Sequence, residues 1–275
     1  MRVVRPALMV ALMAGISALT VTFASPTGAE AAPVPLAPVN YVAMGDSYSS
    51  GVGSGSYIAA SGSCDRSTKA YPYLWAAAHA PASFAFVACS GAKTTDVSAN
   101  QLSALSATTT LVSISIGGND LNFAGIMEDC NLYGTSRCVS DINAAENTAR
   151  TQLPGWLDTL YGQIRSRAPY AHVVVLTYPA FYDPHAPWYC IGLSSTSRSK
   201  VDEGANVLDG VIKAEATKPQ YGFAVADVRS QFAAGHQICD SGSWMHSVDW
   251  TFITQSYHPT ASGQSGGYLP AFSAS

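Results

Sequence analysis

Short apolar runs of strand length alternate with stretches of helical periodicity along most of this chain. The strand-like runs cover residues 40–44, 84–88, 111–116, 172–177 and 222–226. Between them, apolar residues recur at helical spacing over 153–164 and, more loosely, over 201–212. Alternating strands and helices of this length favour a parallel sheet with helices on both faces. The sequence therefore predicts a three-layer α/β fold with a central parallel sheet of about five strands.

Three motifs of glycine and small polar residues follow the first three of these runs. Gly45-Asp46-Ser47 comes directly after the first run, Gly91 after the second, and Gly117-Gly118-Asn119-Asp120 after the third. Ligands of a parallel α/β sheet bind outside the carboxyl ends of its strands. The motifs are therefore expected at one rim of the sheet, where Ser47 can serve as a nucleophile if a base and hydrogen-bond donors lie nearby.

Four separated segments of the chain together resemble one family, the GDSL or SGNH hydrolases. They are the three motifs above and, near the end of the chain, Ser256-Tyr257-His258-Pro259. Their order is the family's order, and the chain looks most like the secreted lipases and phospholipases of actinobacteria. The resemblance implies the flavodoxin-like SGNH-hydrolase fold, with Ser47 as nucleophile and His258 as base. It also implies an oxyanion hole formed by the backbone N–H groups of Ser47 and Gly91 and the side-chain amide of Asn119.

The residue types suit these implied roles. A histidine can take the serine proton and pass it to the leaving alcohol. Gly91 leaves its N–H open to close approach because it has no Cβ, and the Asn119 amide donates hydrogen bonds without carrying a charge. The prediction is ester hydrolysis through an acyl-enzyme intermediate, with no cofactor and no metal.

Five other histidines compete with His258 for the role of base: His79, His172, His185, His236 and His246. His258 is preferred because its segment, His-Pro-Thr-x-x-Gly, lies just ahead of a predicted C-terminal helix, as the base of the family does. His246, in the aromatic stretch Trp244-Met245-His246, is the second choice.

One position departs from the family pattern. Most members carry an aspartate three residues before the histidine, where it orients the ring and stabilises the imidazolium, whereas this chain has Gln255 there. A neutral amide supplies no negative charge. We therefore predict a Ser47–His258 dyad in which the backbone carbonyl of Ser256 accepts the Nδ1 proton of the histidine. Asp249, nine residues upstream of the histidine, is the alternative partner if its loop folds back.

Residues 1–31 have the pattern of a secretory signal peptide. Arg2 and Arg5 precede an apolar run over 7–23, and Ala29-Glu30-Ala31 forms a small-residue cleavage pattern. A membrane anchor is the alternative, but small residues interrupt the run and prolines follow it. We expect a secreted, extracellular protein in which residues 32–275 form a single SGNH/GDSL hydrolase domain.

The charge of the chain restricts its partners. The formal net charge is −4 at pH 7, and only 12% of the residues are charged. A mildly acidic chain has no electrostatic footprint for nucleic acid, and it lacks the polybasic patch that draws proteins to anionic membranes. We therefore expect a monomer whose partner is a lipid or ester substrate, met at a membrane or micelle surface through apolar and aromatic groups.

Six cysteines form an even set, and in an exported chain they are expected to be oxidised. Sequence alone leaves their connectivity open, but the spacing favours neighbours, and the family resemblance implies the same pairs: Cys64 with Cys89, Cys130 with Cys138, and Cys190 with Cys239. A zinc site is the alternative, but no two cysteines have the close spacing of a zinc knuckle. We expect the bridges to hold long loops near the active site.

Another serine-hydrolase fold also places a nucleophile at the end of a strand. The nucleophile elbow of α/β-hydrolases needs Gly-x-Ser-x-Gly, and here Ser49 stands where the second glycine would be. The predicted nucleophile also follows the first strand and not one midway along the chain. The sequence contains no Gly-x-Gly-x-x-Gly or Walker-type loop, so a nucleotide cofactor is unsupported.

Aromatic residues of the expected loops could line an acyl groove, touch lipid, or pack beneath the disulfide loops: Tyr48, Tyr57, Phe123, Tyr133, Tyr178, Phe181, Tyr182, Trp188 and Tyr189. The resemblance implies hydrolysis of fatty-acyl esters of lipids, by a lipase or a phospholipase A1. Carbohydrate acetyl esters are also substrates in the family, so an acetyl esterase is one alternative. A non-catalytic module that binds lipid or glycan is another, because the usual aspartate is missing.

Overall fold

A parallel sheet of five strands lies at the centre of the computed structural model, which describes residues 1, 3, 38–183, 190 and 192–275. The strands are β1 (Asn40–Gly45), β2 (Ser83–Phe86), β3 (Leu111–Ser115), β4 (His172–Leu176) and β5 (Ala224–Ala226). Their order across the sheet is β2-β1-β3-β4-β5, and every neighbouring pair is parallel. This is the strand order of flavodoxin-like sheets. The predicted fold class is therefore confirmed.

All five strands fall on the predicted apolar runs, but four of them are shorter than predicted. β3 and β4 end one residue early, and the larger differences are at the end of β2 and the start of β5. β2 ends at Phe86 because the N–H groups of Val87 and Ala88 both bond to the same carbonyl, that of Ala43, at 2.8 and 3.1 Å. The chain bends away from the sheet at this point. β5 begins only at Ala224, since the N–H of the preceding residue still bonds to the end of the previous helix.

Helices fill the connections between the strands. They are α1 (Ser47–Ser50), α2 (Tyr71–His79), α3 (Thr94–Asn100), α4 (Phe123–Leu132), α5 (Gly134–Thr151), α6 (Leu153–Arg167), α7 (Ser195–Ala216), α8 (Arg229–Ala233), α9 (Ala261–Gly263) and α10 (Leu269–Ser273). Shorter helical turns are η1 (Ala59–Cys64), η2 (Leu102–Ala104), η3 (Asn119–Leu121), η4 (Ile253–Gln255) and η5 (Gln264–Tyr268). Predicted helical stretches became α6 and α7, and the predicted C-terminal helix is built from α9, η5 and α10.

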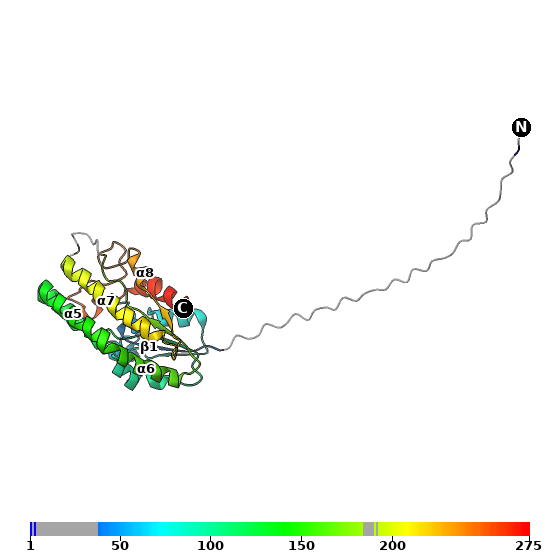
Figure 1. The fold of residues 1–275 in the computed structure, drawn as a ribbon, viewed down its shortest axis with the longest axis horizontal. Coiled ribbons are helices and arrows are strands. Elements are labelled where there is room, and N and C mark those ends of the chain that lie inside the picture. Colours follow the sequence, from blue (N-terminus) through cyan, green and yellow to red (C-terminus); the bar gives the residue numbers. More distant parts are fainter. Residues whose placement is uncertain (2, 4–37, 184–189, 191) are drawn as a thin grey trace. The chain divides into compact units, whose positions relative to one another are not determined.

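The helices form two layers. Helices α5, α6 and α7 contact one another and α3 contacts α6, whereas α2, α8 and α10 contact η5. Figure 1 shows α5, α6 and α7 side by side over the sheet. Because crossovers are right-handed, the connection from β1 to β2 lies on the opposite face of the sheet from the connections that lead from β3 to β5. The sheet is thus covered on both faces.

The chain changes its direction across the sheet at β1. It runs from β1 to the edge strand β2 and then returns to β3, on the other side of β1. Ligands of doubly wound sheets bind outside the carboxyl ends of the strands at such a reversal. The loops that follow β1, β2 and β3 meet there, since β2 and β3 are the two direct neighbours of β1.

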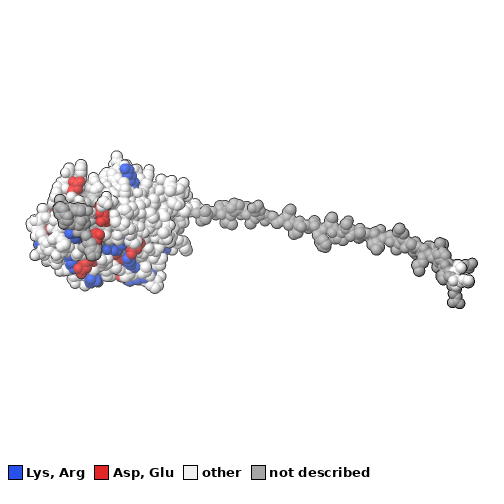
Figure 2. Space-filling view, turned by 90° about the horizontal axis from the view of Figure 1, so that it is seen from above, with Lys and Arg blue, Asp and Glu red and all other residues white. Residues whose placement is uncertain are grey.

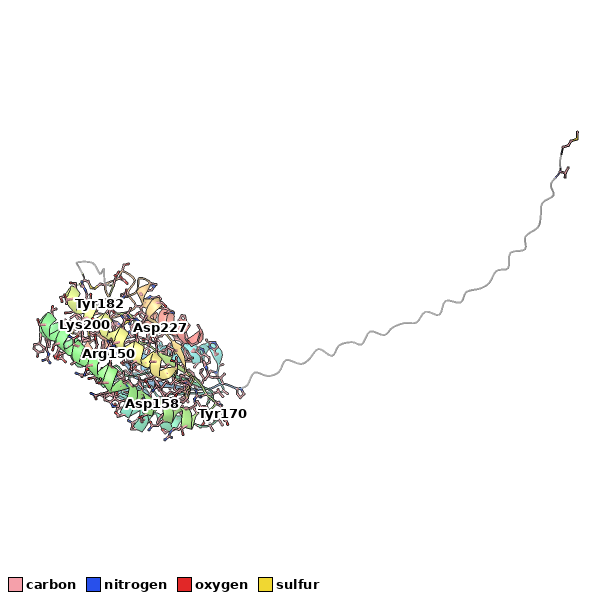
Figure 3. All side chains as sticks on the ribbon, viewed as in Figure 1. Arg150, Asp158, Tyr170, Tyr182, Lys200 and Asp227 are labelled. Atoms are coloured by element: carbon pink, nitrogen blue, oxygen red, sulfur yellow. A yellow bond between two sulfur atoms is a disulfide. The ribbon has the colours of Figure 1, made fainter. Side chains whose placement is uncertain are left out.

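The core consists of side chains between the sheet and its two helix layers. All five residues of β3 are buried, as expected for a parallel strand with both faces covered. Helix α6 buries one stripe completely, formed by Leu153, Leu157, Leu160, Tyr161 and Ile164. Each such side chain stabilises the fold by roughly 1.5–3 kcal/mol relative to an exposed one. Between α5 and α7, Lys200 binds Glu146 at 2.7 Å, on the face shown in Figure 3.

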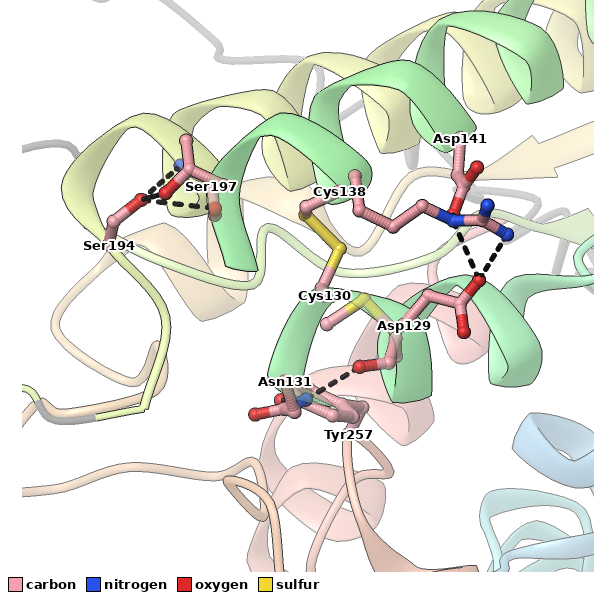
Figure 4. Close-up of a disulfide and its surroundings, with 11 residues drawn as sticks. Asp129, Cys130, Asn131, Cys138, Asp141, Ser194, Ser197 and Tyr257 are labelled. Atoms are coloured by element: carbon pink, nitrogen blue, oxygen red, sulfur yellow. Dashed lines mark hydrogen bonds and ion pairs between the residues drawn. A yellow bond between two sulfur atoms is a disulfide. The ribbon is translucent and has the colours of Figure 1, made fainter. Parts of the chain in front are cut away.

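Three disulfides join loops and helix ends. Cys64 is bonded to Cys89, Cys130 to Cys138, and Cys190 to Cys239. These are the neighbouring pairs that the spacing favours. The first bridge fastens η1 to the loop after β2, and the second joins the end of α4 to the start of α5, as Figure 4 shows.

Some expectations from the sequence lie outside the described residues. They concern His185, Trp188 and Tyr189, and the signal peptide over 1–31 apart from Met1 and Val3. Residues Pro38–Ser275 form one compact unit. In the described part of the chain, we find no helix with the length and apolar character needed to cross a membrane.

Candidate active site

Ser47 lies at the sharp turn between β1 and α1. Gly45 ends the strand with φ +118, and a Cβ at this position would lie 2.3 Å from the Ser115 carbonyl oxygen, so only glycine fits. Asp46 then caps α1, because its Oδ1 accepts the N–H of Tyr48 at 3.0 Å. Ser47 is the first residue of the helix, and its N–H makes no hydrogen bond within the described part of the chain.

The structure brings Ser47 and His258 together. Nε2 of His258 lies 2.8 Å from Oγ of Ser47, and Nδ1 of the same ring lies 3.0 Å from the Ser256 carbonyl oxygen. With its proton on Nδ1, the ring donates to that carbonyl and leaves Nε2 free to accept the serine proton. The hydroxyl of Tyr48 helps to hold the segment that carries His258, because it donates to the Tyr257 carbonyl at 2.6 Å.

Asp249, the alternative acid, and His246, the second choice of base, make other contacts. Asp249 Oδ1 accepts the N–H groups of Thr251 and Phe252 at 2.8 and 3.1 Å and so closes a local turn. The structure shows no carboxylate bonded to His258 among the described residues. His246 directs Nε2 to the Gly53 carbonyl at 2.8 Å. It pairs with the His258 segment through its backbone, since its own N–H donates to the His258 carbonyl.

Burial controls the protonation of His258. Its pKa is lowered from 6.5 to about 4, chiefly because burial disfavours the imidazolium, and the nearby His246 lowers it further. The hydrogen bond to the Ser256 carbonyl opposes this shift only in part. The ring is therefore neutral at pH 7, which is the state that can accept a proton.

The predicted oxyanion donors come from the two loops beside β1. Gly91 is exposed, with φ +77, and its N–H has no hydrogen-bond partner within the described residues. Asn119 donates one of its side-chain N–H groups to the Ala92 carbonyl at 3.0 Å, and the other remains available. The Asp120 carboxylate accepts the N–H and the hydroxyl of Thr94 at 3.1 and 2.6 Å. These bonds fix the two loops to each other.

A buried polar network supports the turn that carries Ser47. The Asp46 carboxylate accepts the hydroxyl of Ser115 at 2.7 Å and that of Tyr178, and the Tyr178 oxygen accepts the Gly118 N–H at 3.0 Å. Burial raises the pKa of Asp46 to about 6, and the two hydroxyl groups partly oppose that rise. The network thus ties together the ends of β1, β3 and β4. Sequence reasoning missed this role of Tyr178.

Another supporting residue was missed. Gln101 binds both sides of one peptide group, since its Oε1 accepts the Gly45 N–H at 2.7 Å and its Nε2 donates to the Gly45 carbonyl at 2.9 Å. Gln101 is buried and lies just after α3. Nothing in the local sequence marks it, because its partner is 56 positions away.

Two apolar cavities adjoin the site. An open groove is lined by His258 and Ser256, by Trp250 and Ile253 of the preceding loop, and by residues of α4. A second cavity lies between α4, α5 and α7 and reaches Tyr48. Phe123 and Met127 of α4 line both cavities. In the described residues, no group of three or more acidic, histidine or cysteine side chains could hold a metal ion.

The family model of the GDSL-like lipases and acylhydrolases matches residues 43–265, from the end of β1 past His258. The chain belongs to this family. It is 54% identical over 236 residues to Lipase 1 of Streptomyces coelicolor, covering 86% of each chain. It is also 51% identical over 231 residues to a lipase of Streptomyces rimosus, covering 84% of each. The chain is accordingly a carboxylic ester hydrolase.

Solved structures agree with this family membership. The fold is similar to phospholipase A1 from Streptomyces albidoflavus, with a TM-score of 0.83 and 50% identity over 86% of this chain and 99% of that one. It is equally similar to an extracellular lipase from Streptomyces rimosus, with a TM-score of 0.82, 50% identity and the same coverage. The predicted GDSL/SGNH family and the predicted likeness to actinobacterial lipases and phospholipase A1 are confirmed.

Proposed function

We propose that this protein is a secreted hydrolase that cleaves fatty-acyl esters of lipids, as a phospholipase A1 or a lipase, through a Ser47–His258 dyad. The observation that carries the proposal is the chain of hydrogen bonds from Ser47 Oγ to His258 Nε2, and from Nδ1 of that ring to the Ser256 carbonyl. Two relatives support lipid esters as the substrate class: Lipase 1 of Streptomyces coelicolor, at 54% identity, and phospholipase A1 of Streptomyces albidoflavus, at 50% identity.

In this mechanism Ser47 Oγ attacks the ester carbonyl while its proton passes to Nε2 of His258. The backbone N–H groups of Ser47 and Gly91 and the amide of Asn119 bind the oxyanion of the tetrahedral intermediate. His258 then gives the proton to the departing alcohol, which leaves an acyl-enzyme on Ser47. A water molecule, activated by the same ring, releases the fatty acid.

If Ser47 and His258 act as a dyad, no carboxylate near the histidine is needed for catalysis. Asp249→Asn keeps the shape of the loop and removes the charge, and we expect it to retain most of kcat. Gln255→Ala is the matched variant at the family's usual aspartate position, and it should behave in the same way. A loss of about 10⁴-fold for Asp249→Asn, the scale of a missing triad acid, would contradict the dyad.

The apolar groove beside His258 favours esters with long acyl chains over acetyl esters as substrates. Its walls are mostly apolar side chains, which bind an extended hydrocarbon through burial and would leave a small acetyl group largely unsupported. We therefore place fatty-acyl lipids first and carbohydrate acetyl esters second. A non-catalytic binding module would not activate Ser47, so covalent labelling by a fluorophosphonate separates that alternative.

The deciding experiment measures fatty-acid release by the purified, oxidised protein from phosphatidylcholine and from a matched triacylglycerol, with Ser47→Ala as the blank. Release that disappears in the variant supports the serine esterase, and the ratio of the two rates separates phospholipase from lipase. No release from either lipid, together with cleavage of acetyl esters, would reject the proposed substrate class.

N-terminal sequencing of protein from the culture medium tests secretion, for which we expect Ala32 as the first residue.

A further inference from the structure

Three large apolar side chains are exposed on one short loop. Trp250, Phe252 and Ile253 keep 62%, 58% and 55% of their surface accessible to solvent. Side chains of this kind are usually buried, and a local group of them on a surface marks a site of interaction. The loop lies directly ahead of the His258 segment in the sequence.

Hydrogen bonds hold this loop in a defined conformation. The Asp249 carboxylate holds the N–H groups of Thr251 and Phe252, and the Asp249 N–H donates to the Ser256 hydroxyl at 2.8 Å. The turn is therefore closed at its base by hydrogen bonds while its apolar tips face outward. The same bonds fix its position next to Ser256, the residue that orients the proposed base.

The opposite wall of the groove ends in two more exposed apolar residues. Leu132 and Tyr133, at the end of α4, are 52% and 67% exposed. They follow Asn131, which lines the groove and donates to the Tyr257 hydroxyl at 2.8 Å (Figure 4). We call Leu132, Tyr133, Trp250, Phe252 and Ile253 the apolar rim. It is continuous with the groove that leads to His258.

The segments that carry the apolar rim contribute no cationic side chain of their own. Residues 94–136 and 230–275 include neither Lys nor Arg. The nearby acids are Glu128, Asp129 and Asp249; Asp129 is paired with Arg137 at 2.7 Å. Figure 2 shows that much of the visible face carries neither sort of charge. Because its own segments supply no Lys or Arg, the apolar rim has no attraction for anionic headgroups and suits lipids without net charge.

We propose that the apolar rim docks the protein on the surface of zwitterionic lipid aggregates, such as phosphatidylcholine bilayers or micelles, with the groove open towards the lipid. The inference rests on the proposed lipid-ester hydrolysis. Insertion of the rim side chains moves their exposed apolar surface from water into the acyl boundary, which supplies the binding free energy without ion pairs. The ester then reaches Ser47 along a path lined by apolar groups.

Binding is tested first without turnover. Ser47→Ala protein is sedimented with phosphatidylcholine vesicles and with vesicles that also contain an anionic phospholipid. The test variant adds Leu132→Ser, Tyr133→Ser and Phe252→Ser, three rim residues that do not line the groove. The control adds Tyr170→Ser, which removes a residue that is 87% exposed ahead of β4, at the amino end of the strands (Figure 3).

We expect the rim variant to bind phosphatidylcholine at least about 30-fold more weakly, because three exposed apolar side chains are lost. Tyr170→Ser should bind unchanged, and anionic lipid should not strengthen binding. Equal binding by the rim variant would overturn the proposal, as would binding that requires anionic lipid. A dimer in gel filtration that the rim substitutions dissociate would also overturn it, because a second copy would then cover the rim.

Activity separates this inference from the proposed function. With Ser47 intact, the rim variant should keep its kcat/KM on a soluble short-chain aryl ester and lose rate on phosphatidylcholine vesicles by the same factor as its binding. An equal loss on both substrates would place these residues in the groove and reject docking. If no lipid is hydrolysed while the rim still determines vesicle binding, the docking inference stands and the proposed function fails.

Discussion

His258 should stay neutral far below the usual titration range of a histidine. Its ring is half-buried and bonded to Ser47 Oγ and to the Ser256 carbonyl. Neither partner carries a charge that would stabilise an imidazolium, and burial disfavours it further. Burial is the main reason why the pKa of His258 falls to about 4, and the hydrogen bond to the Ser256 carbonyl only partly opposes that fall. Acidification of the protein tests this lowered pKa.

The difference from an ordinary histidine is large at mildly acidic pH. At pH 5.5 a ring with an unperturbed pKa of 6.5 is only about 10% neutral. A ring with a pKa of about 4 is then almost entirely neutral. The population able to accept a proton from Ser47 therefore differs about tenfold between the two cases. Because the pKa is lowered, the neutral ring that accepts the proton persists to more acidic pH than in an ordinary histidine.

NMR of protein with ¹³C-labelled histidine rings measures this titration directly. The chain has six histidines, and the resonance that disappears in His258→Gln identifies the ring. We expect its midpoint near pH 4, whereas a midpoint between pH 6 and 7 would show that burial does not lower the pKa of this ring. A kcat/KM profile alone is ambiguous, since burial also raises the pKa of Asp46 to about 6. The NMR midpoint distinguishes the two groups.

Three further outcomes follow from the packing around the site. Tyr178→Phe should lower the free energy of unfolding by about 2–4 kcal/mol in urea titrations, because the Gly118 N–H and an Asp46 oxygen both lose a buried partner. Gly45→Ala should prevent folding or inactivate the protein, since its Cβ would lie 2.3 Å from a backbone oxygen of β3; soluble yield and circular dichroism report this. Gly210→Ala, an exposed site within α7 with nothing near the added Cβ, should instead raise stability by about 0.5–1 kcal/mol.

The sequence predicted the fold well because the relevant signals are local. Apolar runs and helical spacing are set by which face each residue buries, and both persist along the whole chain. The errors lie at strand ends, where a single hydrogen bond decides. The N–H of Phe223 bonds to the Ala216 carbonyl at 3.1 Å, so residue 223 remains tied to the end of α7 and the strand starts late.

The residues that hold the site in place through distant contacts could not be predicted in the same way. Ser47 and Asn119 stand in short motifs after strands, where chemistry and position coincide. Tyr178 and Gln101 act on these motifs from 132 and 56 positions away, and nothing near them in the sequence marks the contact. Tyr178 was noted only as one of many loop aromatics. Its polar role depends on β4 lying beside β3, which the strand order alone determines.

In the proposed reaction, the partner of His258 at Nδ1 is a backbone carbonyl and not a carboxylate, and this changes which groups stabilise the transition state. A carboxylate beside Nδ1 would stabilise the imidazolium that forms as Ser47 attacks, whereas the Ser256 carbonyl mainly fixes the tautomer. A base of lower pKa takes the proton less readily but is neutral over a wider pH range. More of the stabilisation must then come from the oxyanion donors. The bonds from Asn119 to Ala92 and from Thr94 to Asp120 suit that demand, because they hold these donors in place before the substrate arrives.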